Sequence, residues 1–484
     1  RIVQAAYTTR PSRIARPQHP ERANNVSDDN FDVAIIGGGS AGYACALRAA
    51  QLGKNVLLVE HDQLGGTCLH NGCVPTKALL HAAEVADTVR EADQFGVTAS
   101  LGHIDMAGVQ KYKDAITSRL FKGLTGLVAS RGITVVQGDG RLVDARTVEV
   151  DGQHYTAGNV VLATGSRTRS LPGIEINGNR VISSDHALLL DRVPKTVIVL
   201  GGGVIGCEFA SIWRSFGAEV RIVEALPRLL AGDDEDASKL VQRAFRKRKI
   251  AFELNAHVTS VETSESGVTV RLENGKTAEA ELLLVAVGRG PNTDEEALTA
   301  VGIETSRGYV VTDAQLQTTV PGVYAVGDIV AGLQLAHRGF QHGIFVAELL
   351  AGLPAVLVED SAIPRVTYCE PQVASVGLTE AKAIEIHGED QIQSVVYGLG
   401  GNGKSQILKT AGFVKLVRQK GGVVLGVHIV GRNAGELIGE AQVIHGLGCK
   451  PEDVASHVHA HPTQNEAVGE AFMALVGKPL HAHA

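Results

Sequence analysis

The chain has 484 residues, 44% of them hydrophobic and 20% charged, which is long enough for about three domains. Its formal net charge of −7 provides no basic surface, so we expect it to bind neither nucleic acid nor a membrane. Six cysteines in so long a chain do not make a secreted disulfide scaffold, and no apolar run approaches the roughly 20 residues of a membrane span. We therefore expect a cytoplasmic protein.

The first 30 residues differ from the rest of the chain. Four arginines precede the first acidic residue, Glu21, and the stretch shows no periodicity. Transit peptides are rich in arginine and poor in acids in this way, but so are vector remnants and disordered tails. We predict a tail or tag for residues 1–30 and leave it out of the fold reasoning.

A glycine-rich turn follows the first apolar run. Asp32 to Ile36 predicts a strand, and GGGSAG at positions 37–42 meets the G-x-G-x-x-G pattern. A helix to Gln51 and a second strand from Val56 to Glu60 complete the strand–turn–helix–strand frame of a Rossmann-like dinucleotide site.

Each residue of this unit has an expected task. Gly37 permits the tight turn, Gly39 lets the backbone approach a pyrophosphate, and Gly42 lets the helix pack on the strand. The helix N-terminus offers free N–H groups to the phosphates, and Glu60 would accept hydrogen bonds from a ribose. The alternative is a glycine-rich turn without a ligand.

Two cysteines, Cys68 and Cys73, lie in the stretch GGTCLHNGCVPTK. Their spacing fits neither a zinc site nor a thioredoxin-type pair. A regular helix would hold their Cα atoms roughly 8–9 Å apart, beyond the roughly 7 Å limit of a disulfide, so bonding requires a distorted backbone. Asn71-Gly72 tolerates such dihedrals, and Pro75 suits the first turn of a following helix. Two buried structural thiols are the alternative, but an intracellular pair is more often catalytic.

The glycine unit recurs later in the chain in unbroken register. A strand is predicted over Thr196 to Leu200, followed by GGGVIG at positions 201–206 and a strand from Val220 to Glu224. Gly201 and Gly206 thus correspond to the turn and packing glycines of the first unit, and Glu224 to its acid. A match over a whole βαβ unit is more specific than either motif alone. Two dinucleotide sites imply two dinucleotides, with electron transfer between them.

The residues beside each unit indicate which dinucleotide it binds. The first unit leads directly to the cysteines, and a flavin can exchange electrons with a thiolate whereas a nicotinamide only moves hydride, so we predict FAD there. At the second unit, Glu224 suits the free 2′-hydroxyl of NAD and would repel the 2′-phosphate of NADP. Arg221 and Arg228 lie nearby and could weaken that preference.

Strand-rich stretches follow each unit, over residues 133–161 and 258–284. The later stretch TTVPGVYAVGD, ending at Asp328, predicts a strand whose closing carboxylate could hold the hydroxyls of a flavin side chain. A helix N-cap is the alternative for Asp328. From Pro364 the chain alternates strands and helices without a nucleotide motif, which predicts a third domain.

That domain carries the sequence HVHAHPTQNE at positions 457–466. Three alternating histidines could suggest a metal, yet no cysteine or second carboxylate nearby in the sequence completes a ligand set, so we predict none. A general acid/base fits better: Pro462 would hold His461 in a rigid turn, and Glu466 could raise its pKa and fix its tautomer. A dithiol must lose a proton before it attacks a disulfide, and such a histidine contributes about 10²–10⁴-fold. The other histidines, apart from His459, we interpret as surface or packing residues.

From Phe31 to about His481, these motifs together resemble the flavoprotein disulfide reductases, and among them the members that oxidise dihydrolipoamide with NAD⁺. The resemblance implies that Cys68 exchanges with the substrate and that Cys73 faces the flavin. It also implies that Lys77, paired with Glu208, lies near the flavin's reactive nitrogen. Finally, it implies the following further contacts: Gly37, Gly39, Ser40, Gly42, Glu60, Gly66, Thr67, Lys77, Thr164, Gly165, Asp328 and Ala336 with FAD, and Gly201, Gly203, Ile205, Gly206, Glu224 and Gly288 with NAD.

The resemblance also implies the architecture and the partners. The fold would be α/β, with an FAD-binding domain over 31–184 and 305–357, an NAD-binding domain over 185–304, and an α+β dimerisation domain over 358–484. His461 and Glu466 would act on the partner subunit of a homodimer. The expected macromolecular partner is the lipoyl domain of a 2-oxoacid dehydrogenase complex or of the glycine cleavage system.

Departures from the family pattern are small and remove no group with a chemical role. His70-Asn71 replaces the more usual Asn-Val, Thr76 stands where serine is commoner, and the first glycine loop reads GGGSAG. The main alternative is an NAD(P)H-dependent reductase of another disulfide, such as glutathione. A binding or scaffold subunit without redox chemistry is a second alternative, of a different class.

Overall fold

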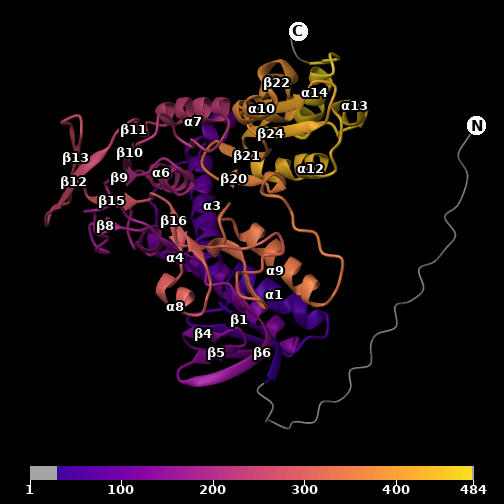
Figure 1. Ribbon diagram of the computed structural model, residues 1–484. Helices are drawn as coiled ribbons and strands as arrows, with labels where there is room; N and C mark the ends of the chain where they lie inside the picture. The colour runs from indigo at the N-terminus through magenta and orange to yellow at the C-terminus, as the bar shows by residue number, and fades with distance from the viewer. Residues whose placement is uncertain (1–29, 482–484) are drawn as a thin grey trace, which may run out of the picture.

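The computed structural model describes residues 30–481, so the predicted tail lies outside the described residues except for its last position. Two domains contain largely parallel sheets and the third contains an antiparallel sheet (Figure 1). This confirms the predicted α/β fold with two Rossmann-like units and an α+β domain near the C-terminus. Among residues 30–481, no helix combines the length and the apolar character that crossing a membrane requires.

The first sheet contains the first glycine unit. Its order is β3-β2-β1-β6-β5-β4, with β3, β2, β1 and β6 parallel and β4 and β5 antiparallel. Its central strands are apolar throughout because both faces are covered, and Ile35, Leu57 and Val160 are fully buried. The elements of this domain are β1 (Asn30–Ile36), α1 (Ser40–Gln51), β2 (Val56–Glu60), α2 (Gly66–His70), α3 (Cys73–Arg90), η1 (Ala92–Phe95), α4 (Met106–Ser130), β3 (Thr134–Gln137), β4 (Gly140–Asp144), β5 (Thr147–Val150), β6 (Gln153–Leu162), β19 (Val323–Ala325), η2 (Gly327–Ile329) and α9 (Ala336–Leu350). After α9 the chain passes through η3 (Asp360–Ala362), which packs against the third domain.

A late segment of the chain returns to this first sheet. β19 pairs in parallel with β6, and α9 packs along α1. The two helices can approach this closely because residue 343 is a glycine: a Cβ there would lie only 2.2 Å from the carbonyl oxygen of Ala41. The strand predicted to run to Asp328 ends instead at Ala325, because Gly327 adopts a φ of +72° and starts the 3-10 turn η2.

The second sheet contains the second glycine unit and is parallel throughout, in the order β11-β10-β9-β15-β8. β8 pairs with β15 although it precedes residue 185, where we expect this domain to begin, so its pairing extends the second sheet to residue 181. The elements are β8 (Val181–Ile182), α5 (Ser184–Ala187), β9 (Thr196–Leu200), α6 (Val204–Phe216), β10 (Glu219–Val223), α7 (Glu235–Lys247), β11 (Ala251–Glu253), the antiparallel β12 (Val258–Thr263), β13 (Val268–Leu272) and β14 (Thr277–Ala280), and β15 (Leu282–Val285).

The helix α6 is buried on several sides. It packs on β9 and β10 of its own sheet, on α3 of the first domain and on β20 (Arg365–Thr367) of the third. Phe209, Ile212 and Trp213 are each at most 4% exposed, as in a helix enclosed all round. α6 therefore contacts all three domains.

A narrow ribbon and a short helical segment link the first two domains. β7 (Ser166–Thr168) pairs antiparallel with β16 (Arg289–Pro291). The segments that leave the first sheet after β6 and the second sheet after β15 therefore lie side by side. The segment back to β19 contains α8 (Glu295–Ala300) and the small hairpin β17 (Thr305–Ser306) and β18 (Tyr309–Val310).

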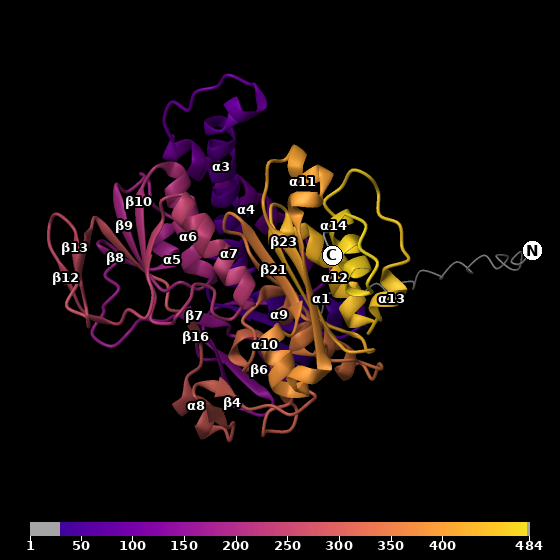
Figure 2. The same cartoon turned by 90° about the horizontal axis from the view of Figure 1, so that it is seen from above.

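The third domain is an antiparallel sheet in the order β20-β21-β24-β23-β22, with helices packed against it (Figure 2). On β23, the buried Lys415 contacts Asp234 and Asp236 of the second domain and Glu380 of its own domain, at 2.7–2.8 Å. This cluster joins the second domain to the third. The remaining elements are β21 (Gln372–Gly377), α10 (Glu380–His387), η4 (Glu389–Gln391), β22 (Ile392–Gly398), η5 (Leu399–Gly401), α11 (Gly403–Ile407), β23 (Phe413–Gln419), β24 (Val424–Gly431), α12 (Ala434–Gly446), α13 (Pro451–Val454) and α14 (Glu466–Leu475).

Candidate active site

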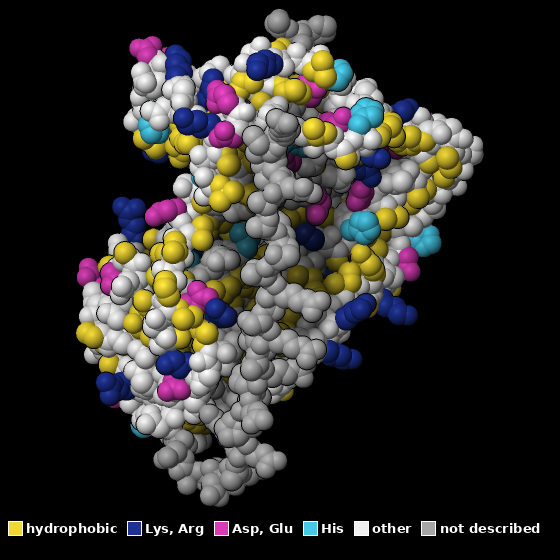
Figure 3. Space-filling model, turned by 90° about the vertical axis from the view of Figure 1, so that its right-hand side faces the viewer, with side chains coloured by type: hydrophobic (Ala, Val, Ile, Leu, Met, Phe, Trp, Pro, Cys, Tyr) yellow, Lys and Arg dark blue, Asp and Glu magenta, His cyan; other side chains and the backbone are white. Residues whose placement is uncertain are grey.

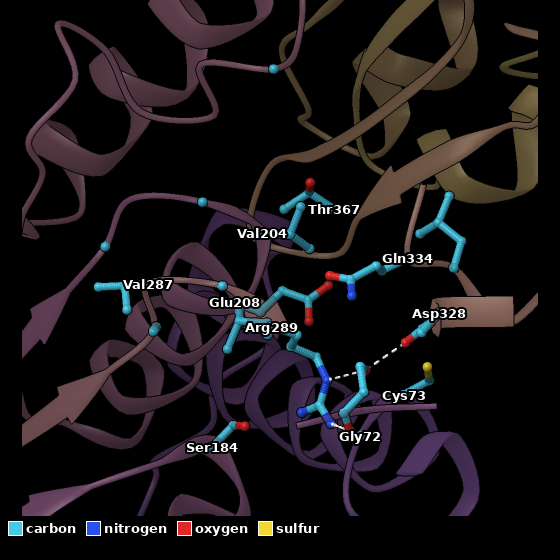
Figure 4. Close-up of a pocket in the computed structure, with 18 of the residues that line it drawn as sticks. Gly72, Cys73, Ser184, Val204, Glu208, Val287, Arg289, Asp328, Gln334 and Thr367 are labelled. Atoms are coloured by element: carbon cyan, nitrogen blue, oxygen red, sulfur yellow. Dashed lines mark hydrogen bonds between the residues drawn. The ribbon is translucent and has the colours of Figure 1, made fainter. Parts of the chain in front are cut away.

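One cavity of about 870 Å³ lies where the three domains meet (Figure 4). Both glycine units, the cysteine pair and β20 of the third domain line it. Its volume is near the upper end of the usual range for small-molecule sites. The structure thus brings the two predicted dinucleotide sites and the two cysteines to a single space.

The first glycine loop is shaped by positions where no side chain fits. Gly37 has a φ of +103°, and a Cβ at Gly42 would lie 1.8 Å from the carbonyl oxygen of Gly37. The helix α1 can therefore begin directly against the end of β1. Its N-cap residue, Gly39, provides no side-chain cap, so the first amides of the helix remain available to a phosphate.

The second loop repeats this construction. Gly201 has a φ of +109°, and a Cβ at Gly206 would lie 1.9 Å from the carbonyl oxygen of Gly201. The N-cap residue Gly203 again lacks a side-chain cap, and a Cβ there would point into open space. Two uncapped helix N-termini in one cavity fit the diphosphates of two dinucleotides.

The acids that follow the two units are already held by backbone amides. One oxygen of Glu60 accepts a hydrogen bond from Gly38 N at 2.6 Å, and the other accepts one from Asp62 N at 2.8 Å. Glu224 makes the equivalent bonds to the amides of its own glycine loop and of Leu226. Glu224 lines the cavity, whereas Glu60 does not. Both carboxylates are therefore fixed in place by the loops that they follow.

Three hydrogen-bonded polar side chains line the cavity between the first two domains. Ser166 Oγ donates to Asp328 Oδ2 at 2.6 Å, and Arg289 Nε donates to Ser166 Oγ at 2.8 Å (Figure 4). The nearby Gln334 Nε2 is buried and has no hydrogen-bond partner among the described residues, which leaves a donor free for a ligand. No role was predicted from the sequence for Ser166, Arg289 or Gln334, although Arg289 lies between two glycines in VGRGPN, at positions 287–292.

The residues predicted to contact the two nucleotides fall into two groups, according to whether they line the cavity. Those that line the cavity are Gly39, Ser40, Thr67, Lys77, Gly165, Asp328, Ala336, Gly201, Gly203, Ile205, Glu224 and Gly288. Those that do not line it are Gly37, Gly42, Glu60, Gly66, Thr164 and Gly206. Members of the second group shape the loops: a Cβ at Gly66 would lie 2.8 Å from Gly39 Cα, for example, and Thr164 donates to the carbonyl oxygen of Asn292 at 2.7 Å.

The backbone between the two cysteines is distorted, as the sequence predicts. α2 ends at His70 and α3 begins at Cys73, because Asn71 and Gly72 have non-helical dihedrals. A Cβ at Gly72 would lie 2.9 Å from the carbonyl oxygen of Thr67, so the turn packs too closely for a larger residue.

Both cysteines are free thiols, and their sulfur atoms interact. The hydrogen bond that Cys68 donates lowers the pKa of Cys73 to about 7; burial opposes this shift and Lys77 supports it. The same interaction, together with burial, raises the pKa of Cys68. Cys73 is thus the thiolate of the reduced pair near neutral pH.

We expect Cys68→Ala to raise the pKa of Cys73 from about 7 toward the ordinary range of a thiol, because the alanine removes the hydrogen-bond donor. Since the thiolate fraction at a fixed pH falls as the pKa rises, the reactive fraction at pH 7 should fall. The pH dependence of iodoacetamide alkylation, followed on the Cys73 peptide by mass spectrometry, measures this. Cys68→Ser keeps a donor and should shift the pKa less; equal shifts in both variants would contradict the assignment.

The predicted pair of Lys77 and Glu208 is formed. Lys77 Nζ lies 3.0 Å from Glu208 Oε2, and the glutamate side chain is 3% exposed against 34% for the lysine. The other oxygen of Glu208 accepts a hydrogen bond from Tyr368 N at 2.9 Å. Burial acts against the lysine charge, but Glu208 and Cys73 more than offset it and raise the pKa of Lys77. A permanent ammonium therefore lies one helical turn beyond Cys73.

The predicted histidine–glutamate pair is also formed, but away from the cavity. His461 Nδ1 lies 2.7 Å from Glu466 Oε1, and Thr463 N donates to the other carboxylate oxygen at 2.8 Å. This amide, with His461, lowers the pKa of Glu466. The His461 side chain is 77% exposed and does not line the cavity of its own chain.

The neighbouring histidine has a partner that sequence reasoning missed. His459 Nε2 lies 2.8 Å from Glu440 Oε1 of α12, and Asn465 donates to the second oxygen of that glutamate. No group of three or more histidine, cysteine or acidic side chains within residues 30–481 is arranged to hold a metal.

Comparison with known proteins places the chain in a family. Residues 31–343 match the family described as pyridine nucleotide-disulphide oxidoreductase, and residues 363–472 match the dimerisation domain of that family. The chain therefore belongs to the pyridine nucleotide-disulphide oxidoreductases, whose members use FAD and NAD. This confirms the class of protein and the two cofactors predicted from the sequence.

Named relatives narrow the comparison. Dihydrolipoyl dehydrogenase of Bacillus subtilis is 40% identical over 461 residues, which cover 93% of this chain and 97% of the relative. The mitochondrial dihydrolipoyl dehydrogenase of Pisum sativum is 38% identical, over 95% of this chain and 94% of its own. Among solved structures, LpdA of Mycobacterium tuberculosis matches with a TM-score of 0.85 and 27% identity, over 92% of this chain and 99% of that chain. The HOCl-induced flavoprotein disulfide reductase RclA of Escherichia coli matches with 0.81 and 27%, over 91% and 99%.

Proposed function

We propose that this protein oxidises dihydrolipoamide to lipoamide and reduces NAD⁺ to NADH, as a homodimer. The observation that supports this most directly is the Cys68–Cys73 pair in one cavity with both glycine loops. The named dihydrolipoyl dehydrogenases, which match nearly the whole chain, support the choice of substrate.

The cysteines would carry the substrate chemistry. When Cys68 and Cys73 are joined as a disulfide, a substrate thiolate attacks the sulfur of Cys68, and Cys73 leaves as a thiolate. The second substrate thiol then attacks the substrate sulfur that is bonded to Cys68 and displaces Cys68. The substrate leaves with a disulfide, and both enzyme cysteines are reduced. Bound FAD and NAD⁺ supply the two-electron acceptor chemistry that returns the cysteines to the disulfide.

Lys77 and Glu208 would keep the electron-donating sulfur ionised. The Lys77 ammonium stabilises negative charge on Cys73, and Glu208 lies 3.0 Å from that ammonium. The carboxylate is almost fully buried, so the acidic member of the pair is held in place.

The histidine pair would manage protons for the other copy. His461 is exposed and lies outside its own cavity, while Glu466 holds one ring nitrogen and leaves the other free to accept a substrate proton. The third domain also exposes the apolar residues Leu447, Val458 and Leu480. The face of the molecule that carries this domain shows apolar patches among charged and histidine side chains (Figure 3). Both features fit a dimer in which each dyad serves the cysteines of the second copy.

A comparison of substrates tests the proposal. The purified protein should reduce NAD⁺ with dihydrolipoamide, and should reduce glutathione disulfide at least about 100-fold more slowly with either NADH or NADPH. NADPH should be the poorer coenzyme of the two, because Glu224 lines the cavity and repels a 2′-phosphate. Faster turnover of glutathione disulfide would instead support the alternative, a reductase of another disulfide. An absorbance spectrum recorded before and after NADH should show the long-wavelength band of a thiolate next to an oxidised flavin, which a scaffold subunit would lack.

We propose the lipoyl domain of a 2-oxoacid dehydrogenase complex or of the glycine cleavage system as the macromolecular partner, and a cytoplasmic location. The dihydrolipoamide group would enter the cavity while attached to such a domain. The cysteine content supports a reducing compartment.

A further inference from the structure

The ion pair of Lys77 and Glu208 lies where the three domains meet. Lys77 comes from α3 of the first domain and Glu208 from α6 of the second. Tyr368 follows β20 of the third domain, and its ring centroid lies 4.9 Å from Lys77 Nζ. This distance is within the roughly 6 Å range of a cation–π contact. Lys77 therefore contacts a carboxylate on one side and an aromatic ring on another.

The backbone around Tyr368 is anchored to α6 at two points. Tyr368 N donates to Glu208 Oε1 at 2.9 Å, and Glu370 N donates to Ser211 Oγ at 3.0 Å, one helical turn further along. Arg248 adds hydrogen bonds to Ser211 Oγ and to the carbonyl oxygen of Glu370. The ring of Tyr368 thus projects from a segment that cannot shift without breaking these bonds.

The Lys77 ammonium needs a second contact to hold its direction more than an arginine guanidinium would. The ammonium sits on a flexible four-carbon stem, and the Lys77 side chain is one-third exposed, so it has access to solvent-facing rotamers. Glu208 contacts the ammonium with one oxygen only, because its other oxygen is occupied by Tyr368 N. A single contact fixes distance but not direction, and the ring provides the second contact.

We propose that Tyr368 is a positioning residue of the active site, whose ring holds the Lys77 ammonium on the side of the cavity that faces Cys73. The ring surface does this rather than the hydroxyl. The inference rests on the proposed function in one respect, namely that the Cys73 thiolate is the sulfur that Lys77 serves. The charged and titratable groups around the contact are Cys73 and Lys77 of α3, Glu208 of α6 and Glu436 of α12.

The test compares Tyr368→Leu with the conservative Tyr368→Phe. The leucine removes the ring face, so the pKa of Cys73 should rise by about half a unit to one unit, equivalent to roughly three- to tenfold less thiolate at a pH below it. Phenylalanine keeps the ring and should leave that pKa within about 0.2 unit of the unaltered protein. The readout is the pH dependence of iodoacetamide alkylation of the Cys73 peptide in the reduced holoenzyme.

A double-mutant comparison separates positioning from a general structural effect. In a Lys77→Met background, Tyr368→Leu should shift the pKa of Cys73 no further, since the ammonium that it positions is gone. Tyr368→Met, which fills similar space without a ring, repeats the test if the leucine variant loses its FAD. An unchanged pKa in the leucine and methionine variants, or the same shift in phenylalanine and leucine, would overturn the inference.

The alkylation test does not require dihydrolipoamide. Failure of the unaltered protein to turn over dihydrolipoamide would therefore contradict the proposed function alone. A Cys73 pKa that is insensitive to the ring at position 368 would contradict the role of Tyr368 alone.

Discussion

Replacing Cys73 with serine should abolish the oxidation of dihydrolipoamide, lowering kcat by at least about 10³-fold, as expected when a covalent catalytic group is removed. Serine cannot form the disulfide that accepts the substrate's electrons, and its hydroxyl stays protonated where the pKa of the thiol is lowered to about 7. The measurement is NADH production from dihydrolipoamide and NAD⁺, with protein concentration normalised to bound FAD.

The control for Cys73→Ser is the part of the reaction that bypasses the cysteines. FAD content should remain unchanged, and a soluble quinone that takes electrons directly from the flavin should still be reduced by NADH. Dihydrolipoamide turnover within tenfold of the unaltered protein would show that the electrons do not pass through this sulfur.

Replacing His461 with glutamine should lower kcat/KM for dihydrolipoamide by about 10²–10⁴-fold, because the substrate thiol then loses its general base. Glutamine keeps a side chain of similar size with a hydrogen-bonding end, but it cannot accept the proton. The steady-state rate at several pH values measures the effect, and part of the loss should be recovered at high pH, where the substrate thiol ionises unaided. An unchanged rate would exclude His461 from proton transfer.

Mixing the two variants locates the dyad. A heterodimer of one Cys73→Ser chain and one His461→Gln chain keeps an intact cysteine pair on one chain and an intact histidine on the other. If the dyad acts across the dimer, this mixed species should recover about half of the normal activity, since one of its two sites is complete. If the dyad acted within its own chain, neither site would be complete and the mixture would stay inactive.

The repeated glycine units were predictable because their signal is local. Each conserves its spacing along the chain, and the positive φ of Gly37 and Gly201 follows from a turn that any Rossmann-like unit must make. The break between Cys68 and Cys73 was predictable for the same reason: regular helix geometry is incompatible with their bonding, and Asn71-Gly72 is where the helix gives way.

Contacts between segments that are distant along the chain leave no local pattern in the sequence. Ser166 and Arg289 meet because β7 and β16 pair, and Glu440 reaches His459 because α12 lies against the turn before α14. No periodicity connects these positions, so only the folded chain reveals them. The end of β19 at Ala325 was missed because the left-handed conformation of Gly327 depends on the turn that follows it.

The burial of α6 against three domains has a consequence for engineering. The helix that opens the second nucleotide loop at Gly203 also carries Glu208 and Ser211, which bond to the backbone of the third domain. The second Rossmann-like unit is therefore not an interchangeable cassette. A chimaera that imports this unit to alter coenzyme preference must import matching surfaces on α3 and β20 as well, or it will disturb the sulfur chemistry that it was meant to leave untouched.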